Sequence, residues 1–592
     1  MILNLLDWSF VIGFFIISLA IGIWAAKAGK KNSDDYFTAG GKMPWWILGV
    51  SMVATTFSTD TPNLVTDIVR QNGVSGNWTW WAFLLTGMLT VFVYARLWKK
   101  SGVITDVEFY ELRYSGTISR FLRGFRAIYL GLVFNVMIMA TVSLAAIKIG
   151  GVLMGLAPWQ TVLIAGTITV IYSSIGGLRG VVITDFLQFF LAILGSIIAA
   201  VVALGHPKVG GLTNLLTHEN VVGKLDLFPS MSNPEVFVVL FLMPLLVQWW
   251  SVWYPGAEPG GGGYIAQRMF AAKNEDHSIK AVLFFNVAHY ALRPWPWIIV
   301  ALCSLVVFPD LESFKTAFPD SESIINHDLG YPAMLTFIPA GLLGLVVTSL
   351  IAAYMSTIST HLNWGASYIV NDFYKRFVKP EASQKEMLNL GRLITVGLMI
   401  LTMLFALVLD NALSAFNILL QIGAGTGLIF ILRWFWWRIN AATELAAMII
   451  SFLVAIYFGV LHTKLGFDAF PAWQELLIGV GLTTVGWVVV AFTTAPTSLD
   501  KMISFINKVN PGGPGWKRIS DQAAQSGLLT AKEETWKVPV GILCMVAGTI
   551  GVYSFLMGTG MIIYGKYIVG ISLFVIATLC TFVIKKLWPK IN

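Results

Sequence analysis

Long apolar runs recur from one end of the chain to the other, and they limit its fold more than any other feature. Runs of 18 or more apolar residues predict membrane-spanning helices. Only 12% of the 592 residues are charged, against about 25% in soluble domains. The sequence has none of the short alternating strands that a transmembrane β-barrel requires. It therefore predicts an all-α polytopic membrane protein with fifteen spans: 7–26, 45–68, 80–98, 126–156, 160–176, 182–204, 235–257, 280–308, 335–370, 388–410, 413–437, 441–461, 473–494, 538–557 and 566–585.

Basic residues in the loops predict the orientation of these spans. With the N-terminus outside, about 30 Lys and Arg residues fall inside and about 6 outside, as the positive-inside rule requires. The odd number of spans then puts the C-terminus in the cytoplasm. Asp7 to Ala26 is long enough to span and is followed by no cleavage site, so we expect no cleaved signal. The interpretation is a multi-pass protein of the cell membrane, such as a bacterial inner membrane.

Several function classes are excluded by what the sequence lacks. The net charge of +8 comes from short loops between spans, so it does not indicate nucleic-acid binding. The cytoplasmic loop 495–537 is too short for a nucleotide-binding domain, and no G-x-x-x-x-G-K-[ST] motif is present. The three cysteines have no metal-binding spacing and are interpreted as small buried hydrophobes. The spans hold no set of nucleophile and base, so we do not expect an enzyme.

Two spans are interrupted in a way that predicts a binding site. Ser51 to Asn63 combines several hydroxyl residues with Asp60 and Pro62, and proline removes a backbone donor from a helix. Five spans later, Gln248 to Gly263 ends in a run of prolines and glycines that cannot continue as a helix. Each interruption alone is compatible with a simple kink. Their matched positions predict two inverted repeats of five helices, whose sites lie at the broken helices.

A cluster of hydroxyls marks a third span. Ser356, Thr357, Ser359 and Thr360 crowd into five residues. Such residues often bond back to the preceding helical turn. Beside a broken helix, however, they offer neutral oxygens for a monovalent cation, and carbonyls freed by the break supply further ligands. We therefore expect an ion site between the first broken span and this one.

At these residues the chain resembles the sodium/solute symporter family, which includes sodium/sugar, sodium/proline and sodium/sialic acid transporters. The resemblance runs from about Asp7 to about Ala442, and the order and spacing of its motifs are specific. The motifs are Ser51–Asp60, Asp106–Tyr114, Gly176–Gly177 with Thr184–Asp185, Tyr264–Arg268, Ala352–Thr357 and Asn371–Tyr374.

The resemblance implies a LeuT-like core of five plus five helices. In this chain the core would follow one extra N-terminal helix and precede about four C-terminal ones. The implied divisions are 1–44 for the extra helix, 45–234 for the first repeat, 235–440 for the second repeat, and 441–592 for the C-terminal helices with the loop 495–537.

The resemblance also implies one sodium ion, or two. The residues that match the main sodium site are Ala54, Phe57, Ala353, Ser356 and Thr357. Those that match the second site of some members are Asp185, Ser359 and Thr360. An acid inside a span is costly and usually functional. The alternative is that Asp185 is an ordinary acid at a helix end near Arg179.

The substrate pocket departs from the sugar-transporting pattern. Thr61 and Trp80 stand where bacterial sugar members have glutamine and glutamate, although Asp60 keeps the acidic position. Arg293 lies about mid-membrane, where it could contact hydroxyls, bind a carboxylate or pair with Asp60 as a gate. Lys148 is expected to snorkel to the outer surface. The predicted substrate-binding residues are Thr56, Asp60, Thr61, Trp81, Gln248, Trp249, Arg293 and Gln421.

The resulting expectation is sodium-coupled uptake of a small polar solute, with a monosaccharide or polyol first. An organic acid resembling sialic acid comes next, because of Arg293, and an amino acid third. The other classes are a proton-coupled transporter, a channel, and a transporter-derived sensor. A channel would show a repeated filter or a ring of charge, and a sensor would carry an output domain. The expected partners are the small-molecule substrate and the lipid bilayer, for a protein that works as a monomer.

Overall fold

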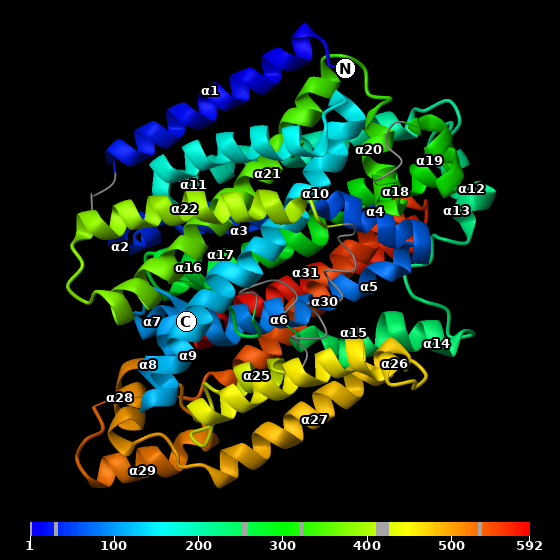
Figure 1. The fold of residues 1–592 in the computed structure, drawn as a ribbon. Helices are drawn as coiled ribbons and strands as arrows, with labels where there is room; N and C mark the ends of the chain where they lie inside the picture. The colour runs from blue at the N-terminus through cyan, green and yellow to red at the C-terminus, as the bar shows by residue number, and fades with distance from the viewer. Residues whose placement is uncertain are drawn as a thin grey trace.

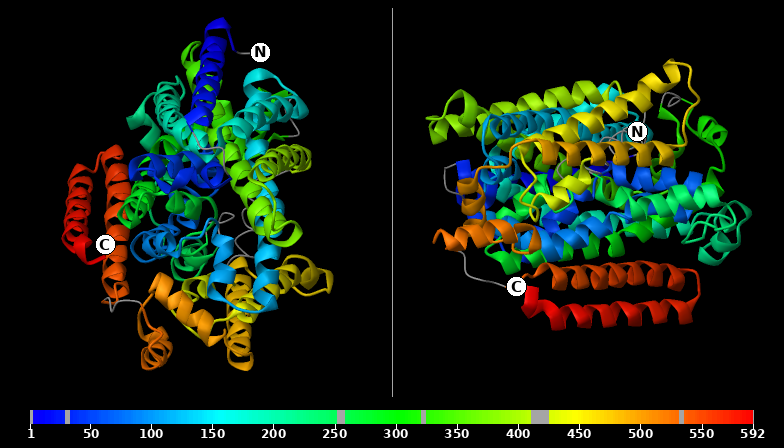
Figure 2. Two further views of the ribbon diagram at one scale, coloured as in Figure 1. Left: turned by 90° about the vertical axis from the view of Figure 1, so that its left-hand side faces the viewer. Right: turned by 90° about the horizontal axis from the view of Figure 1, so that it is seen from below.

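The structure is a computed structural model that describes residues 3–28, 33–251, 258–319, 324–409, 425–530 and 535–591. In these residues almost all regular structure is helical, and one isolated bridge joins Met43 to Ala272. The long helices run side by side (Figure 1). The start of α1 (Leu5–Ala28) and the end of α31 (Tyr567–Ile591) lie at opposite ends of this bundle (Figures 1 and 2). The predicted all-α fold class is confirmed.

The helices follow the apolar runs closely. Among the described residues, eleven helices are long and apolar enough to cross a membrane. Together with the shorter apolar helices Trp45–Thr56, Pro158–Ile171 and Pro234–Leu246, they correspond to every predicted span but one. That one, 413–437, lies largely outside the described residues, and α24 (Gly427–Leu432) is its described part. The divisions into repeats stay a prediction.

The other helices of the bundle are bounded as follows: α5 (Trp78–Trp81), α6 (Leu84–Leu89), η3 (Thr90–Tyr94), α7 (Ala95–Ser101), α8 (Phe109–Arg113), α9 (Thr117–Ile128), η5 (Tyr129–Phe134), α10 (Asn135–Met154), α11 (Pro158–Leu204), α17 (Glu275–Val287), η8 (Ala288–Leu292), α18 (Pro294–Val307), α21 (Leu342–Ser367), η11 (Tyr368–Val378), α22 (Gln384–Ala406), α25 (Ala441–Ile456), α27 (Ala472–Thr493) and α30 (Val538–Ile563).

The first predicted interruption separates α3 (Trp45–Thr56) from α4 (Asp60–Asn72). The backbone leaves the helical conformation at Phe57, with φ −91° and ψ 71°. Pro62 lies inside the first turn of α4, where a missing N–H removes no helical bond. The break therefore precedes the proline, and its ends are the carbonyl end of α3 and the amide end of α4.

The second interruption lies between η7 (Gln248–Trp250) and α16 (Gly263–Ala271). Residues 252–257 lie outside the described residues. The described part between them, from Glu258 to Gly262, is not helical. Both breaks are therefore found where the sequence predicts them.

A third change of direction occurs inside α11, at Gly177. Its φ of 54° and ψ of −170° divide α11 into two helices, which match the predicted spans 160–176 and 182–204. A Cβ at Gly177 would lie 2.7 Å from the Tyr36 ring. Glycine is therefore required here both by the positive φ and by the close approach of Tyr36.

The extra helix α1 anchors the helix that carries the hydroxyl cluster. It packs along α11 and α21. Asp7, which is fully buried, accepts hydrogen bonds from the backbone N–H groups of Gly341 and Gly344, each at 2.7 Å. A carboxylate at a helix N-terminus satisfies orphan N–H groups and complements the helix dipole. Asp7 thus fixes the start of α21.

The predicted cytoplasmic loop 495–537 contains segments that pack against the bundle. It contains α28 (Leu499–Val509) and α29 (Lys517–Gln525), which lie at one end of the bundle in Figure 1. α28 buries an apolar face against α7 and α8. Between the two helices, the turn-rich segment brings Trp516 into the core, where its indole N–H donates to the Trp434 carbonyl at 2.8 Å. The segment therefore does more than link two spans.

Candidate functional site

The first candidate ion site lies where the end of α3 meets the middle of α21. Its predicted ligands Ala54, Phe57, Ala353, Ser356 and Thr357 are all buried. The Thr357 hydroxyl donates to the Thr55 carbonyl at 2.7 Å, so it joins α21 to α3 just before the break. A hydroxyl that donates its proton keeps lone pairs for a cation. The arrangement therefore leaves neutral oxygens from both helices in one buried place.

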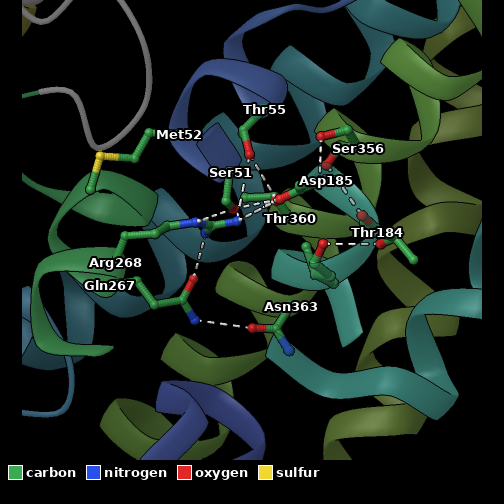
Figure 3. A network of polar contacts seen from close by, with 12 residues as sticks. Ser51, Met52, Thr55, Thr184, Asp185, Gln267, Arg268, Ser356, Thr360 and Asn363 are labelled. Atoms are coloured by element: carbon green, nitrogen blue, oxygen red, sulfur yellow. Dashed lines mark hydrogen bonds and ion pairs between the residues drawn. The ribbon is translucent and has the colours of Figure 1, made fainter. Parts of the chain in front are cut away.

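Asp185 joins a third helix, α11, to this place. Its carboxylate is fully buried and accepts hydrogen bonds from Ser356 at 2.6 Å and from Ser51 at 2.5 Å. It is therefore not an ordinary acid at a helix end, which was the alternative interpretation. Figure 3 shows Asp185 between Ser51 and Ser356, with Thr360 beside them. Of the other residues predicted for a second ion, Ser359 bonds back to the Ser356 carbonyl at 3.2 Å.

Arg268 on α16 enters the same cluster, and sequence reasoning did not place it there. The positive-inside count places it among the basic residues of cytoplasmic loops, where it would meet water, whereas the structure buries it completely. Its Nη2 lies 3.6 Å from Asp185 and donates to Thr360 Oγ1 at 2.7 Å (Figure 3). Its Nε donates to Ser51 at 3.2 Å. Arg268 therefore ties both broken helices to α11 and α21.

The signal for this arginine was present in the sequence. Arg268 follows the second break by only a few residues, in the motif Tyr264–Arg268. An arginine so close to an interruption in a membrane span needs a buried partner. Asp185 and Asp60 are the acids in predicted spans that match the family pattern, and Asp185 is the one that lies beside Arg268.

Arg293 closes the carbonyl end of α3. Its Nη1 donates to the Thr56 carbonyl at 2.6 Å, and its Nη2 lies 2.5 Å from Nδ1 of His289. The Thr56 hydroxyl lies 3.0 Å from the same histidine nitrogen. A cation at a helix C-terminus is favoured by the helix dipole. Arg293 is thus engaged with the broken helix, and His289, missed from the sequence, completes the group.

Asp60 occupies the opposite end of the same break. It stands in the first turn of α4, where a negative charge is favoured. Its Oδ1 is buried and has no hydrogen-bond partner among the described residues. Arg293 lies close enough to act on it electrostatically. The Thr61 hydroxyl lies 3.5 Å from the Thr56 carbonyl, so these predicted substrate residues do surround one break.

Of the remaining predicted substrate residues, Gln248 and Trp249 lie at the second break and Trp81 lies in α5. Gln248 donates to the Thr79 carbonyl at 3.1 Å, and the Trp249 carbonyl accepts from the Thr86 hydroxyl. Trp81 is fully buried, and its indole N–H has no partner among the described residues. Gln421 lies outside the described residues. The structure therefore brings Gln248 and Trp249 to the helix that contains α5 and α6.

A small cavity of about 40 Å³, with a mostly apolar wall, lies between α6, α16 and α17. Its wall includes the hydroxyl residues Thr86, Thr90, Tyr264 and Tyr290, and Asn286. Roughly 10–15 Å³ of such space holds one water molecule. The cavity in this conformation is therefore large enough for a few waters and too small for a sugar.

These features define a class of protein. Two interrupted helices, a buried oxygen cluster beside one of them, and charged residues enclosed in the bundle are typical of secondary transporters. Comparison with known proteins gives the family. The model of the sodium:solute symporter family matches residues 36–451, and the chain belongs to that family. It is a sodium/solute symporter and not an enzyme.

Individual relatives are distant. The chain is 24% identical over 505 residues to a sodium/glucose cotransporter of Vibrio parahaemolyticus, covering 82% of this chain and 90% of that one. It is 25% identical over 506 residues to the sodium/sialic acid symporter NanT of Aliivibrio fischeri, covering 81% and 90%. The structure of a Na⁺-coupled sialic acid symporter in a substrate-bound outward-open state matches with a TM-score of 0.65. That match has 20% identity and covers 84% of this chain and 99% of the other, so it supports the fold alone.

Proposed function

We propose that this symporter binds sodium between α3 and α21 and uses its entry to drive uptake of a monosaccharide or polyol. One observation supports the proposed sodium site most directly. The Thr357 hydroxyl reaches the Thr55 carbonyl at 2.7 Å, while the neighbouring Ser356 reaches Asp185 at 2.6 Å. Neutral hydroxyl and carbonyl oxygens from two helices, with a carboxylate behind them, suit a hard monovalent cation.

The proposed ligands are the carbonyls of Ala54, Phe57 and Ala353 and the hydroxyls of Ser356 and Thr357. Sodium at this position would neutralise the partial negative charge at the C-terminal end of α3. It would also hold α3 against α21, and so preserve the shape of the break where Thr56 and Asp60 stand. Sodium binding and the solute pocket would thereby favour each other.

We propose that one sodium ion binds in this conformation, at the site between α3 and α21. A second ion at Asp185, Ser359 and Thr360 would compete with Arg268, whose guanidinium already donates to Thr360 at 2.7 Å. Two unit charges about 4 Å apart repel by about 4 kcal/mol at an effective dielectric constant of 20. A second ion would therefore require that Arg268 withdraw from Thr360.

The solute class rests on the polar groups around the two breaks. The wall of the cavity between α6, α16 and α17 includes hydroxyls, the Asn286 amide and the Glu258 carboxylate, and these groups can hydrogen-bond the hydroxyls of a sugar or polyol. Arg293 is engaged with Thr56 and His289, which weakens the case for an organic acid. An amino acid is a third possibility, since Asp60 offers an unpaired carboxylate oxygen to an amine.

The proposed cycle needs no covalent chemistry. Sodium binds from outside and organises the break, and the solute then binds beside it and favours closure on that side. Opening toward the cytoplasm releases both. The membrane potential contributes about 2.3 kcal/mol per charge per 100 mV. We propose the cell membrane as the location, with the N-terminus outside, the C-terminus in the cytoplasm and a monomer as the working unit.

The test is uptake into proteoliposomes with a panel of radiolabelled solutes. The panel should contain monosaccharides, polyols, sialic acid and other organic acids, and amino acids, each with sodium or potassium outside. Sodium-dependent accumulation of a sugar or polyol is the expected result. If only an organic acid accumulates, the solute is an acid rather than a sugar, and Arg293 is the residue expected to bind its carboxylate. Equal uptake in sodium-free buffer at low pH would replace sodium with protons as the coupling ion.

A further inference from the structure

A buried ion pair joins two elements at the end of the bundle where α10 ends. Lys148 of α10 lies 2.7 Å and 2.6 Å from the two carboxylate oxygens of Asp328. Asp328 belongs to η10 (His327–Leu329), in the connection between α18 and α21. Lys148 is 1% exposed and Asp328 is 5% exposed. The expectation that Lys148 snorkels to the outer surface is therefore wrong. The transport cycle proposed above assigns no role to Lys148.

η10 and α20 (Gly330–Leu335) form a unit that Arg70 joins to α4 and to the end of α18. Arg70 of α4 donates to the carbonyls of Ser304 at 2.9 Å and Phe308 at 2.8 Å, which end α18. The same guanidinium lies 4.9 Å from the centre of the Phe314 ring in α19 (Leu311–Ala317) and reaches His327 at 3.4 Å. The pair between Lys148 and Asp328 is thus a polar tie between this unit and α10.

The unit covers polar groups of the broken helix. α20 (Gly330–Leu335) packs against α4, and a Cβ at Gly330 would lie 2.9 Å from the Thr66 methyl group. The Thr66 hydroxyl and the Asn63 amide, both buried, have no hydrogen-bond partner among the described residues. A buried polar group without a partner costs free energy that water would restore. Lifting α20 and η10 from α4 would therefore hydrate groups that are now unsatisfied.

We propose that the ion pair between Lys148 and Asp328 is the latch of the outer gate, which opens when the connection with η10 and α20 moves away from α10. This inference rests on the proposed transport cycle and on its orientation. A buried ion pair suits a gate because desolvation nearly cancels its Coulomb attraction. Both charges regain water on opening, so the two states have similar free energies. Asp67 of α4 is close enough to act on both groups electrostatically, and offers Lys148 a second partner in the open state.

An apolar pair in the same place would act differently. It would gain nothing from hydration, so it would hold the gate closed. Removal of only one charge would leave the other buried without a partner and would favour opening, which hydrates it. The latch therefore predicts effects of opposite sign for single and double substitutions. A pair that merely stabilises the fold predicts the same pattern of signs in the unfolding temperature, but it predicts no change in labelling at the outer gate under conditions in which the protein stays folded.

The experiment measures labelling of a cysteine at Thr66 by a membrane-impermeant thiol reagent. The background is the full chain with Cys303, Cys544 and Cys580 changed to alanine, in right-side-out vesicles with potassium and no solute. Lys148→Ala and Asp328→Asn are each expected to raise the labelling rate by roughly a hundredfold or more, because each leaves one charge buried without its partner in the closed state. The double variant K148M/D328L is expected to label more slowly than the parent, because an apolar pair holds the gate closed. The exposed pair of Lys315 and Glu312 on α19, 2.9 Å apart, is the matched control, and its removal is expected to leave the rate unchanged.

Equal labelling of parent and single variants would overturn the latch, and so would a double variant that labels as fast as the parent or faster. If the single variants do not fold, the double variant alone tests the latch, which requires that it label more slowly than the parent. If the labelling rate changes with these substitutions but not when sodium replaces potassium, the latch proposal stands and the proposed sodium site is contradicted. The two proposals can therefore fail separately.

Discussion

Buried arginines organise the polar interior residue by residue, and each does so at a helix end or a carboxylate. Arg268 lies beside Asp185, and Arg293 caps the carbonyl end of α3. Arg113 donates to the carbonyls of Arg433 and Ile439, at 3.1 Å and 3.3 Å, and its guanidinium lies over the Trp516 ring at 4.5 Å. A guanidinium has five donors in a rigid fork, which allows it to join several elements at once.

The Arg268 contact makes a testable prediction about stability. Arg268→Ala leaves the fully buried Asp185 without a cation, and loss of one partner of a buried pair costs about 3–5 kcal/mol. The double variant R268A/D185N removes the orphaned charge, so it should be more stable than Arg268→Ala alone. The measurement is thermal unfolding of purified protein, followed by tryptophan fluorescence.

Lys208, an exposed residue, provides the control for this series, because Lys208→Ala should leave the unfolding temperature almost unchanged. Should the double variant unfold at the same temperature as Arg268→Ala, Arg268 would contribute by packing and hydrogen bonding rather than by its charge.

At the scale of elements, ion pairs also position the short helix α8 outside the membrane-spanning segments. Glu111 accepts hydrogen bonds from Arg376 of η11 at 2.8 Å and 2.9 Å, and from Arg123 of α9 at 2.8 Å. Burial raises the pKa of Glu111, but the bonds from Arg376 and Arg123 outweigh it and lower the pKa from 4.5 to about 2. α8 is thereby held to two long helices.

The lowered pKa of Glu111 makes the stability of the folded protein depend on pH, and the direction of this dependence follows from the shift. Because the folded pKa lies below the unfolded one, the contribution of Glu111 to stability is complete above about pH 4.5 and is lost as the pH falls toward 2. Wild type should unfold at a higher temperature than Glu111→Gln at about pH 6, and the difference should shrink by about pH 3. A difference that is constant over this range would contradict the assignment.

At the scale of the whole molecule, the sequence was sufficient for the helical fold and for both breaks. An apolar run long enough to cross the membrane satisfies its own backbone hydrogen bonds in lipid by forming a helix. A run of prolines and glycines cannot continue a helix, so it marks a break. The Thr357 hydroxyl does lie against α3, where it donates to the Thr55 carbonyl, while the ion assigned to Ser356 and Thr357 stays a prediction.

The partners of buried charges could not be predicted in the same way. Arg268, His289 and Lys148 bind groups that are distant in sequence, and which acid or carbonyl meets which base depends on how the helices pack. A loop count also assigns every basic residue near a span end to water, although Arg268 turns inward. The solute contacts of Gln421 stay a prediction, since it lies outside the described residues.

The central claim is that neutral oxygens of α3 and α21 hold one sodium ion, and equilibrium binding of ²²Na⁺ to purified protein tests it most directly. Ser356→Ala and Thr357→Ala should each weaken sodium binding by about tenfold, as expected for loss of roughly 1.4 kcal/mol from one ligand. Thr348→Ala is the control, because Thr348 lies on the same helix and, among the described residues, its hydroxyl bonds only back to the Gly344 carbonyl, at 2.7 Å. Unchanged sodium affinity in both Ser356→Ala and Thr357→Ala would contradict the account.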